Sequence, residues 1–387
     1  MKKIVLSTLL TFIFFSCTSD NAKEDESQTA YVSDDFVSYN LDIDLPQQRF
    51  ADLIESVEIV RLEETENSLL SYIRNLQKTE NNLVFHTSGQ ESDVLVYDLN
   101  GSFLKKISKK GNGPEEYEDI NDLWLENDTL IIYSRAKSEV IRYNLEGDFI
   151  RKDKLPQRVG HIYGYKDGYA LEMNDYLIDD SSRYRYASLD KNFELSGLYL
   201  KVDDQMSEGM MWFSNNPIGP YKDGLTLFRM MSDTVYLLNE NNFIPFVHFD
   251  FGSEWFWNEG RDLTGERNSE MQNTDKVWAA KAYFNNSRIW ISPSSGYSQE
   301  KDPPSFLIDR STGIIDAVDM RKGDKSKGIA YAMTWDNDQL IFTVQSPDMG
   351  SFLSELSEDQ IKFRQGTTLE EIESSENPVL MWVKFKD

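Results

Sequence analysis

The sequence has few residues that could bind a metal or form a disulfide. Its 387 residues contain one cysteine, Cys17, and three histidines, His86, His161 and His248. A single cysteine excludes an internal disulfide and any Cys₄ or Cys₂His₂ zinc site, and three histidines offer little for a histidine-based metal centre. We therefore expect neither a metal nor a cofactor.

Basic residues are also scarce, because Lys and Arg total 40 against 66 Asp and Glu, for a net charge of −26. Sequence-independent binding to nucleic acid needs a basic surface that displaces counterions from phosphates, so we expect no nucleic-acid partner. Aromatic residues, in contrast, make up 13% of the chain. A disordered chain would be poor in them, so the composition predicts a folded protein.

Motifs that mark common hydrolases are missing. The chain contains neither Gly-x-Ser-x-Gly nor His-Glu-x-x-His. Adjacent carboxylates such as Asp179 and Asp180 point in opposite directions in an extended chain and cannot share one substrate. A catalytic pair of carboxylates would have to come from distant parts of the chain, and we assign no catalytic residue.

No apolar run near the N-terminus is long enough to span a membrane. Residues 4–15 form an apolar run of 12 residues behind Lys2 and Lys3, whereas a spanning helix needs about 20. The run is typical of a signal peptide. Ser16-Cys17 directly after it resembles the bacterial lipoprotein box, except that Phe14 stands where Leu or Val is usual. The resemblance implies cleavage after residue 16 and fatty acyl chains such as palmitate on Cys17. The alternative is an ordinary secretory signal with an incidental cysteine.

Polar and acidic residues follow Cys17, with no large apolar side chain between residues 18 and 27. Such a segment is typical of a flexible tether, which we assign to residues 17–39. Its acidic character resembles the surface-export signal of Bacteroidota lipoproteins. We therefore expect an outer-membrane lipoprotein of the cell envelope, periplasmic or surface-exposed, that meets the membrane through the lipid on Cys17.

The rest of the chain repeats a pattern of short strands. Residues 94–107 match residues 140–152 after a shift of 46 positions. A polar turn followed by an apolar strand recurs six times, at residues 80–85, 126–133, 166–171, 222–227, 285–291 and 336–342. Four strands per unit of about 40–50 residues is the pattern of a β-propeller blade. The sequence thus predicts an all-β fold over residues 40–387, a six-bladed β-propeller of four-stranded antiparallel blades. The alternative is a β-sandwich whose hairpins resemble one another by chance.

Two segments outside the repeat have their own interpretation. We expect the N-terminal strand at residues 57–62 to complete the last blade beside residues 379–385, which would close the ring without a covalent bond. Residues 252–280 do not fit the repeat and indicate an insertion between the fourth and fifth units. Insertions in repeat proteins lie on one face and often carry function.

Several segments resemble the six-bladed β-propeller lipoproteins of Bacteroidota, over residues 40–155. The most specific is Gly-x-Gly-Pro-Glu-Glu-Tyr, with Gly111, Gly113, Pro114, Glu115 and Tyr117. Glu115 stands where the family has glycine. The glycines permit a sharp reversal and the proline fixes φ, so we expect a connector between blades. The resemblance implies a fold, an envelope location and a lipid anchor, and it implies no activity.

Aromatic residues near loops are the candidates for ligand binding. We select Trp212, Trp255, Trp257 and Tyr163, together with His161, which could point into the central channel. Flat aromatic faces suit sugar rings or peptides. The alternative is that these side chains form core between blades.

These observations favour a monomeric, lipid-anchored envelope propeller that binds a glycan, a peptide or an envelope protein through loops on one face, without catalysis. One alternative is an envelope glycan hydrolase or lyase that uses carboxylates from different blades. Another is a structural scaffold of an outer-membrane complex.

Overall fold

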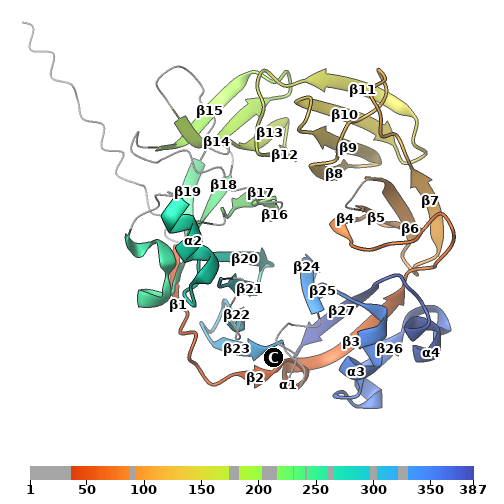
Figure 1. The fold of residues 1–387 in the computed structure, drawn as a ribbon, viewed down its shortest axis with the longest axis vertical. Coiled ribbons are helices and arrows are strands. Elements are labelled where there is room, and N and C mark those ends of the chain that lie inside the picture. Colours follow the sequence, from red (N-terminus) through yellow and green to blue (C-terminus); the bar gives the residue numbers. More distant parts are fainter. Residues whose placement is uncertain are drawn as a thin grey trace, which may run out of the picture. The chain divides into compact units, whose positions relative to one another are not determined.

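A computed structural model describes residues 36–87, 92–173, 183–202, 216–229, 231–239, 242–259, 265–296, 303–320 and 330–387. All of them belong to one compact unit that begins at Val32. Six β-sheets follow one another around a ring in this unit (Figure 1). The fold is the six-bladed β-propeller that the repeat predicts.

Blades 1, 2 and 3 are four-stranded and antiparallel, and each is built from consecutive strands. Blade 1 contains β4 (Arg74–Lys78), β5 (Asn82–His86), β6 (Val94–Asp98) and β7 (Phe103–Ile107). Blade 2 contains β8 (Asp122–Glu126), β9 (Thr129–Ser134), β10 (Glu139–Asn144) and β11 (Phe149–Lys154). Blade 3 contains β12 (His161–Tyr165), β13 (Gly168–Glu172), β14 (Arg183–Asp190) and β15 (Leu195–Val202).

Blades 4 and 5 each gain a fifth strand from the N-terminal segment. Blade 4 contains β16 (Ile218–Tyr221), β17 (Gly224–Leu227), β18 (Thr234–Asn239) and β19 (Asn242–Asp250), and β1 (Val37–Asn40) pairs with β19 in parallel. Blade 5 contains β20 (Ala279–Phe284), β21 (Arg288–Ser294), β22 (Ser305–Asp309) and β23 (Ile315–Asp319), and β2 (Gln48–Arg49) pairs with β23 in parallel. Residues 37–39, which the sequence suggests as part of the tether, are therefore in a sheet.

Blade 6 joins the two ends of the propeller. It contains β24 (Ala330–Asp336), β25 (Gln339–Val344), β27 (Val379–Phe385) and β3 (Ile54–Arg61), with β26 (Ile361–Phe363) parallel to β3. The antiparallel register of β27 and β3 pairs Val383 with Val57 and Met381 with Ile59. The expected closure by an N-terminal strand is confirmed.

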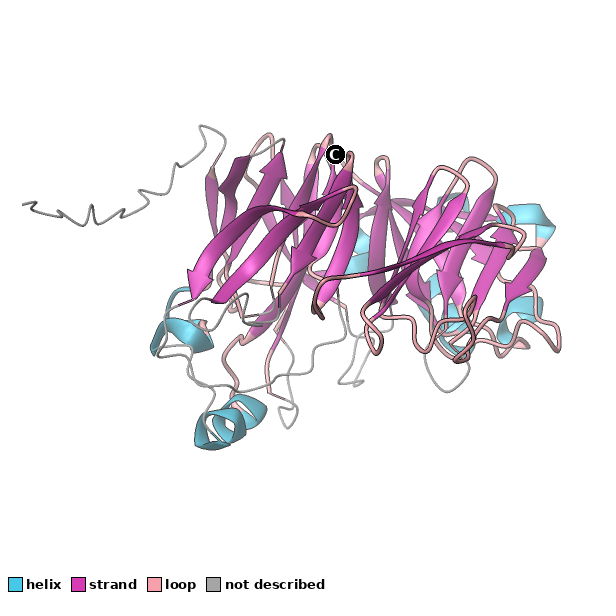
Figure 2. Ribbon diagram, turned by 90° about the horizontal axis from the view of Figure 1, so that it is seen from above, coloured by secondary structure: helices cyan, strands magenta, loops and turns pink. Residues whose placement is uncertain are grey.

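The connections on the two faces of the ring differ in length. Because the strands alternate in direction, the turns from first to second strand and from third to fourth strand lie on one face, the hairpin face. Connections from second to third strand, and from one blade to the next, lie on the other, the loop face. Figure 2 shows the hairpins along the upper side and most longer connections along the lower side.

Tight turns on the hairpin face follow from the local sequence. Asn127, Lys166, Lys222 and Asn337 have φ of 54°, 50°, 51° and 55°, in two-residue turns that lead into the second strands. Such left-handed residues match the twist of the flanking strands. At Gly101, with φ of 89°, an added Cβ would lie 2.1 Å from the carbonyl oxygen of Arg61. Only glycine fits at this contact between the first blade and the closing strand.

The helices lie in the longer connections. The segment between β19 and β20 contains α2 (Gly265–Asn273) and two 3₁₀ helices, Gly252–Glu254 and Phe256–Glu259. The segment between β25 and β27 contains α3 (Met349–Leu353), α4 (Leu369–Glu373) and three 3₁₀ helices, Ser346–Asp348, Glu358–Gln360 and Arg364–Gly366. A short helix, α1 (Phe50–Leu53), joins β2 to β3.

The core is divided among the junctions between blades. Six clusters of buried apolar side chains are present, one at each junction between neighbouring blades. Trp124 belongs to the cluster between blades 2 and 3, and Trp290 to that between blades 5 and 6. Each blade is therefore buried on both faces, which makes the ring a rigid support for its loops.

Candidate functional site

A polar cluster lies at the mouth of the central channel on the loop face. It consists of Asn121, Asp122, His161 and Asn216, which stand at or just before the starts of the inner strands of blades 2, 3 and 4. The Asp122 side chain is only 1% exposed. Its Oδ1 lies 2.8 Å from Nδ1 of His161 and accepts a hydrogen bond from Nδ2 of Asn216 at 2.9 Å. Its Oδ2 accepts one from the backbone N–H of Ile162 at 3.0 Å. One carboxylate therefore joins three blades.

The charge of this cluster is set by burial and by Asp122. Burial alone lowers the pKa of His161, but the neighbouring carboxylate of Asp122 raises it by more, with a smaller contribution from Glu172. The net shift raises the pKa of His161, so the cluster favours the protonated imidazole.

A second buried histidine, His86, lies at the end of β5 in blade 1. Its Nδ1 lies 2.9 Å from the carbonyl oxygen of Thr87 and its Nε2 lies 3.1 Å from Oδ1 of Asn75. Burial lowers the pKa of His86 to about 4. The pKa values of the two buried histidines, in blades 1 and 3, therefore shift in opposite directions, because only His161 contacts a carboxylate.

The polar cluster connects three blades, and its Asp122 and His161 side chains are nearly closed to solvent. A histidine oriented by a carboxylate can act as a general base, but the proton donor must reach it. His161 is 5% exposed. Among the residues that the structure describes, no hydroxyl or thiol forms a hydrogen bond with it, and no group of three or more His, Cys, Asp or Glu side chains could hold a metal.

Exposed apolar side chains form a different feature of the loop face. Leu69, Tyr72 and Tyr331 are 54%, 64% and 58% exposed. Tyr72 lies two residues before β4, and Tyr331 is the second residue of β24. β4 and β24 are neighbouring inner strands, so these side chains lie near one part of the channel rim. We call them the exposed rim residues. Sequence reasoning missed them, because the motif Ser-Leu-Leu-Ser-Tyr carries no signal of exposure.

The tryptophans selected from the sequence have other positions. Trp255 and Trp257 are buried in the cluster between blades 4 and 5. Trp255 stacks on Phe251 with ring centroids 5.5 Å apart, and Nε1 of Trp257 donates a hydrogen bond to the carbonyl oxygen of Trp278 at 2.6 Å. They pack the segment between β19 and β20 onto the ring. Trp212 lies outside the described residues.

Tyr163, the remaining aromatic candidate, is also packed. Its ring stacks on Trp124 with centroids 5.9 Å apart, and burial raises its pKa to about 12. It contacts the core between blades 2 and 3. The arrangement brings Tyr163 and His161 together on β12 and separates both from Trp255 and Trp257.

The Gly-rich segment is a connector from blade 1 to blade 2. The backbone N–H of Gly111 donates to the carbonyl oxygen of Tyr117 at 2.8 Å, and that of Gly113 donates to Oε2 of Glu116 at 2.7 Å. An added Cβ on Gly111 would lie 1.9 Å from the same Oε2. The Glu116 carboxylate therefore occupies the space where a bound anion would have to lie.

The end of the connector is fixed by tyrosines. Tyr117 is fully buried, and its hydroxyl donates to the carbonyl oxygen of Ser92 at 3.0 Å. The hydroxyl of Tyr143 donates to the carbonyl oxygen of Glu115, which follows Pro114, at 2.6 Å. These contacts make the connector part of the junction between blades 1 and 2.

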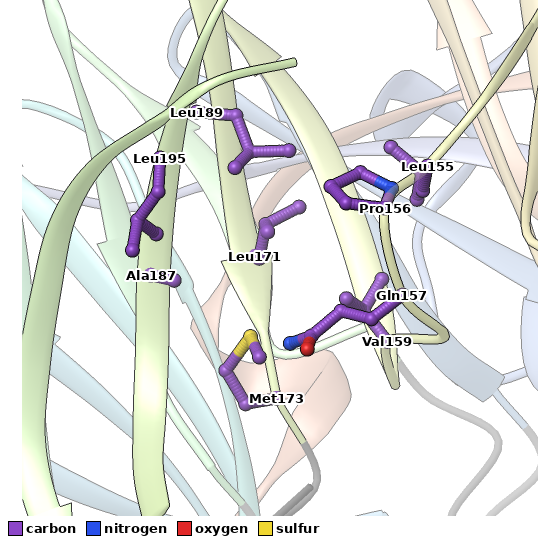
Figure 3. Close-up of a pocket in the computed structure, with 9 residues that line it drawn as sticks. All are labelled: Leu155, Pro156, Gln157, Val159, Leu171, Met173, Ala187, Leu189 and Leu195. Atoms are coloured by element: carbon purple, nitrogen blue, oxygen red, sulfur yellow. The ribbon is translucent and has the colours of Figure 1, made fainter. Parts of the chain in front are cut away.

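An apolar cavity of about 190 Å³ lies between blades 2 and 3 (Figure 3). We call it the inter-blade cavity. Its lining comes from the connector at residues 155–159 and from blade 3, and consists of Leu155, Pro156, Gln157, Val159, Leu171, Met173, Ala187, Leu189 and Leu195. Leu195 is 52% exposed.

Comparison with known proteins agrees with the fold. The model of a family described as a domain of unknown function, DUF4934, matches residues 38–384. A crystal structure of a Bacteroides fragilis protein that is described as exported gives a TM-score of 0.72 at 14% identity, covering 91% of this chain and 100% of that one. A member of the DUF4221 family from Bacteroides vulgatus gives a TM-score of 0.51 at 12% identity, covering 86% and 97%. No curated protein matches. Within the described part of the chain, no helix is both long enough and apolar enough to cross a membrane.

Proposed function

The chain belongs to the DUF4934 family, and on that premise we propose that it is a lipid-anchored propeller of the bacterial envelope that binds a glycan or a peptide on its loop face. The observation that carries the proposal is the group of exposed rim residues beside the channel. Large apolar side chains that gather on a surface tend to mark binding sites. The polar cluster across blades 2, 3 and 4 and the six apolar junctions keep the ring rigid, which lowers the cost of ordering the exposed rim residues around a ligand.

Tyrosine side chains suit this role. The ring of Tyr offers a flat face for a sugar ring or a peptide side chain, and its hydroxyl adds a hydrogen bond. Tyr72 and Tyr331 lie beside the neighbouring inner strands β4 and β24 and are 64% and 58% exposed, and we propose that one ligand contacts both.

The anchor is the second part of the proposal. The apolar run at residues 4–15 and Cys17 behind it support lipidation, and the exported relative from Bacteroides fragilis supports a location outside the cytoplasm. A net charge of −26 would repel the domain from an anionic membrane surface. We therefore assign membrane attachment to the lipid alone. Cys17→Ala should move the protein from the membrane fraction to the soluble fraction, and retention at the membrane would refute the anchor.

Binding is tested with arrays of glycans and peptides probed with the detergent-solubilised full chain. A hit should weaken at least tenfold in the double variant Tyr72→Ala, Tyr331→Ala. Ile314→Ala is the matched control, because Ile314 is also 58% exposed and lies beside β23 at the hairpin face. If the double variant binds the ligand as tightly as the parent protein, the exposed rim residues are not the binding site.

No observation favours the glycan hydrolase. Asp122 is engaged by His161, Asn216 and a backbone N–H, and Glu172 is buried with Nε of Arg229 3.6 Å from its Oε1. A general acid must protonate the leaving group of the substrate, and neither carboxylate is presented to solvent. The scaffold alternative is tested by the same arrays, because a scaffold would give no glycan or peptide hit.

A further inference from the structure

We propose that the inter-blade cavity binds one unbranched alkyl chain that ends in an anionic headgroup, as in a free alkyl carboxylate. The cavity shares no lining residue with the polar cluster or with the exposed rim residues. It is therefore a second site, independent of the proposed binding at the loop face.

The shape of the cavity favours a chain over a ring. Leu189 pairs with Tyr169 in the register of β13 and β14, and Met173 lies four residues further along the same ladder. At about 3.4 Å per residue, the lining extends about 13 Å between these levels. A volume of about 190 Å³ spread over that length has room for one chain. Figure 3 shows Leu189 and Leu195 at one end and Met173 at the other.

The side chains that line the cavity also favour an unbranched alkyl chain. Gln157 is the one residue with a polar side chain among the nine that line the cavity, and none is aromatic. Sugars and aromatic ligands are recognised by stacking on aromatic faces, and this cavity offers none. Aliphatic side chains and the adaptable thioether of Met173 suit methylene groups. Phospholipids carry two acyl chains, whereas this cavity has room for one, so we assign a free single-chain ligand.

The cavity opens to solvent beside Leu195, which is 52% exposed, so a ligand can enter it from the surface. An apolar cavity of about 150 Å³ in another protein stays dry and binds benzene, so a cavity of about 190 Å³ is large enough to bind a small apolar ligand.

The charge at the connector favours an anionic headgroup. Lys154 and Arg158 flank the lining residues of the connector and are exposed, and neither forms an ion pair with another residue in the described ranges. On the opposite wall, Asp190 accepts hydrogen bonds from the backbone N–H groups of Asn192 and Glu194 at 2.8 Å and 2.9 Å. These two basic side chains adjoin the cavity lining in the sequence, and Lys154 stands opposite Glu139 in the register of β10 and β11, in a chain with 26 more acidic than basic residues.

The test is a series of linear alkanoates from four to fourteen carbons, each titrated into the full chain by calorimetry below its micelle concentration. Affinity should rise about fourfold per added methylene and stop rising once the chain fills the cavity. At equal length, the alkanoate should bind more tightly than the alkanol, and the alkanol more tightly than the alkylammonium.

Two variants separate the chain from the headgroup. Ala187→Leu fills the cavity and should weaken both alkanoates and alkanols at least tenfold. The double variant Lys154→Glu, Arg158→Glu should weaken alkanoates at least tenfold and leave alkanols within twofold. Lys222→Glu is the control for charge, because Lys222 is exposed in a turn on the hairpin face of blade 4. Circular dichroism and thermal melts check that each variant folds.

Several results would overturn the assignment. Absence of saturable binding throughout the series, or unchanged binding in folded Ala187→Leu, rules out the cavity as the site. Toluene binding as tightly as hexanol rules out selectivity for an unbranched chain. If the protein binds to phosphatidylglycerol vesicles and Ala187→Leu abolishes that binding, the ligand of the cavity is a membrane lipid and not a free alkyl carboxylate. The double variant Tyr72→Ala, Tyr331→Ala should leave alkanoate affinity unchanged, which separates this proposal from the function of the loop face.

Discussion

The two halves of the ring are held together in different ways. Blades 4, 5 and 6 each carry a fifth strand in parallel with an outer edge, and the closing strand β3 completes blade 6. Blades 1, 2 and 3 have no fifth strand among the residues that the structure describes. Their junctions contain the buried Asp122 carboxylate with its histidine partner, together with tyrosine hydroxyls that donate to backbone carbonyls. A tyrosine contact of this kind is also present between blades 5 and 6, where Tyr283 donates to the carbonyl oxygen of Ala332.

This difference predicts that the two halves respond to different perturbations. Backbone hydrogen bonds between strands and apolar contacts carry no titratable charge, and Arg364 lowers the pKa of the Glu58 carboxyl on the closing strand to about 2, so the half formed by blades 4 to 6 should respond to changes in the chain and should be little affected by pH between 4.5 and 8. The stability that the buried contact between Asp122 and His161 contributes depends on the protonation state of His161. The half formed by blades 1 to 3 should therefore respond to pH and to single polar substitutions.

The largest effect should follow removal of the N-terminal strands. A chain that begins at residue 63 lacks β1, β2 and β3, which leaves blade 6 without the strand that pairs with β27. Buried residues such as Ile59 and Met381 would lose their neighbours, and the ring would have open ends. We expect no cooperative thermal transition. A chain that begins at Val32 is the control, and it should melt like the full chain.

Asp122→Ala should have the next largest effect. It removes the acceptor of His161, of the half-buried Asn216 and of the Ile162 N–H, and the buried imidazole and the Ile162 N–H lose this partner. We expect a loss of about 3–5 kcal/mol in the free energy of unfolding, measured by urea denaturation. Asp190→Ala is a matched carboxylate removal at an exposed turn and should cost far less. Equal losses would contradict the special role of Asp122.

The two buried histidines should give opposite contributions to the pH dependence of stability. The pKa of His86 falls from 6.5 to about 4 on folding, so below pH 6.5 the unfolded chain binds a proton that the folded chain does not. Stability therefore falls as pH drops from 6.5 toward 4. The pKa of His161 is raised above 6.5, so its contribution is complete below pH 6.5 and is lost as pH rises through the folded value.

Urea midpoints between pH 4.5 and 8 test this opposition. His86→Gln should flatten the decline on the acid side, because the variant has no buried imidazole left to protonate on unfolding. His161→Gln should lower stability by a constant amount below pH 6.5 and should remove the loss of stability that the parent protein shows as pH rises from 6.5 through the folded pKa of His161. Parallel pH profiles for both variants would show that the shifts do not oppose each other.

The sequence predicts the blades well because their signals are local. A turn such as Asn100-Gly101 and the alternation in the strand that follows lie within a few residues, and closure by residues 57–62 follows from counting strands. β1 and β2 escape prediction, because four and two residues pair with strands 210 and 270 positions away. Such short segments have no period of their own.

The candidate site was harder to predict for a related reason. Whether Trp255 is buried or exposed depends on which distant residues the fold places around it. The sequence pattern of residues 252–280 does not contain that information. The same is true of Asp122, whose three donors come from two other blades. His161 was selected for its place before an aromatic strand, but nothing in the sequence indicated its carboxylate partner.

The smallest effect on stability should come from Lys362→Ala in blade 6. Arg364 binds the same partner, Glu58, so the two basic residues can be compared directly. Nζ of Lys362 lies 2.8 Å and Nη2 of Arg364 lies 2.6 Å from the Glu58 carboxylate. The lysine side chain is 74% exposed and the arginine 18%, and the arginine also packs over Trp382 and donates to the carbonyl oxygen of Leu99 in blade 1. An exposed pair is worth about 0–1 kcal/mol, so Lys362→Ala should barely move the urea midpoint, whereas Arg364→Ala should lower it clearly. Similar losses in both variants would mean that charge alone holds the closing strand. A large loss in Arg364→Ala alone would show that the junction between blades 6 and 1 depends on packing and on a carbonyl contact that only the arginine makes.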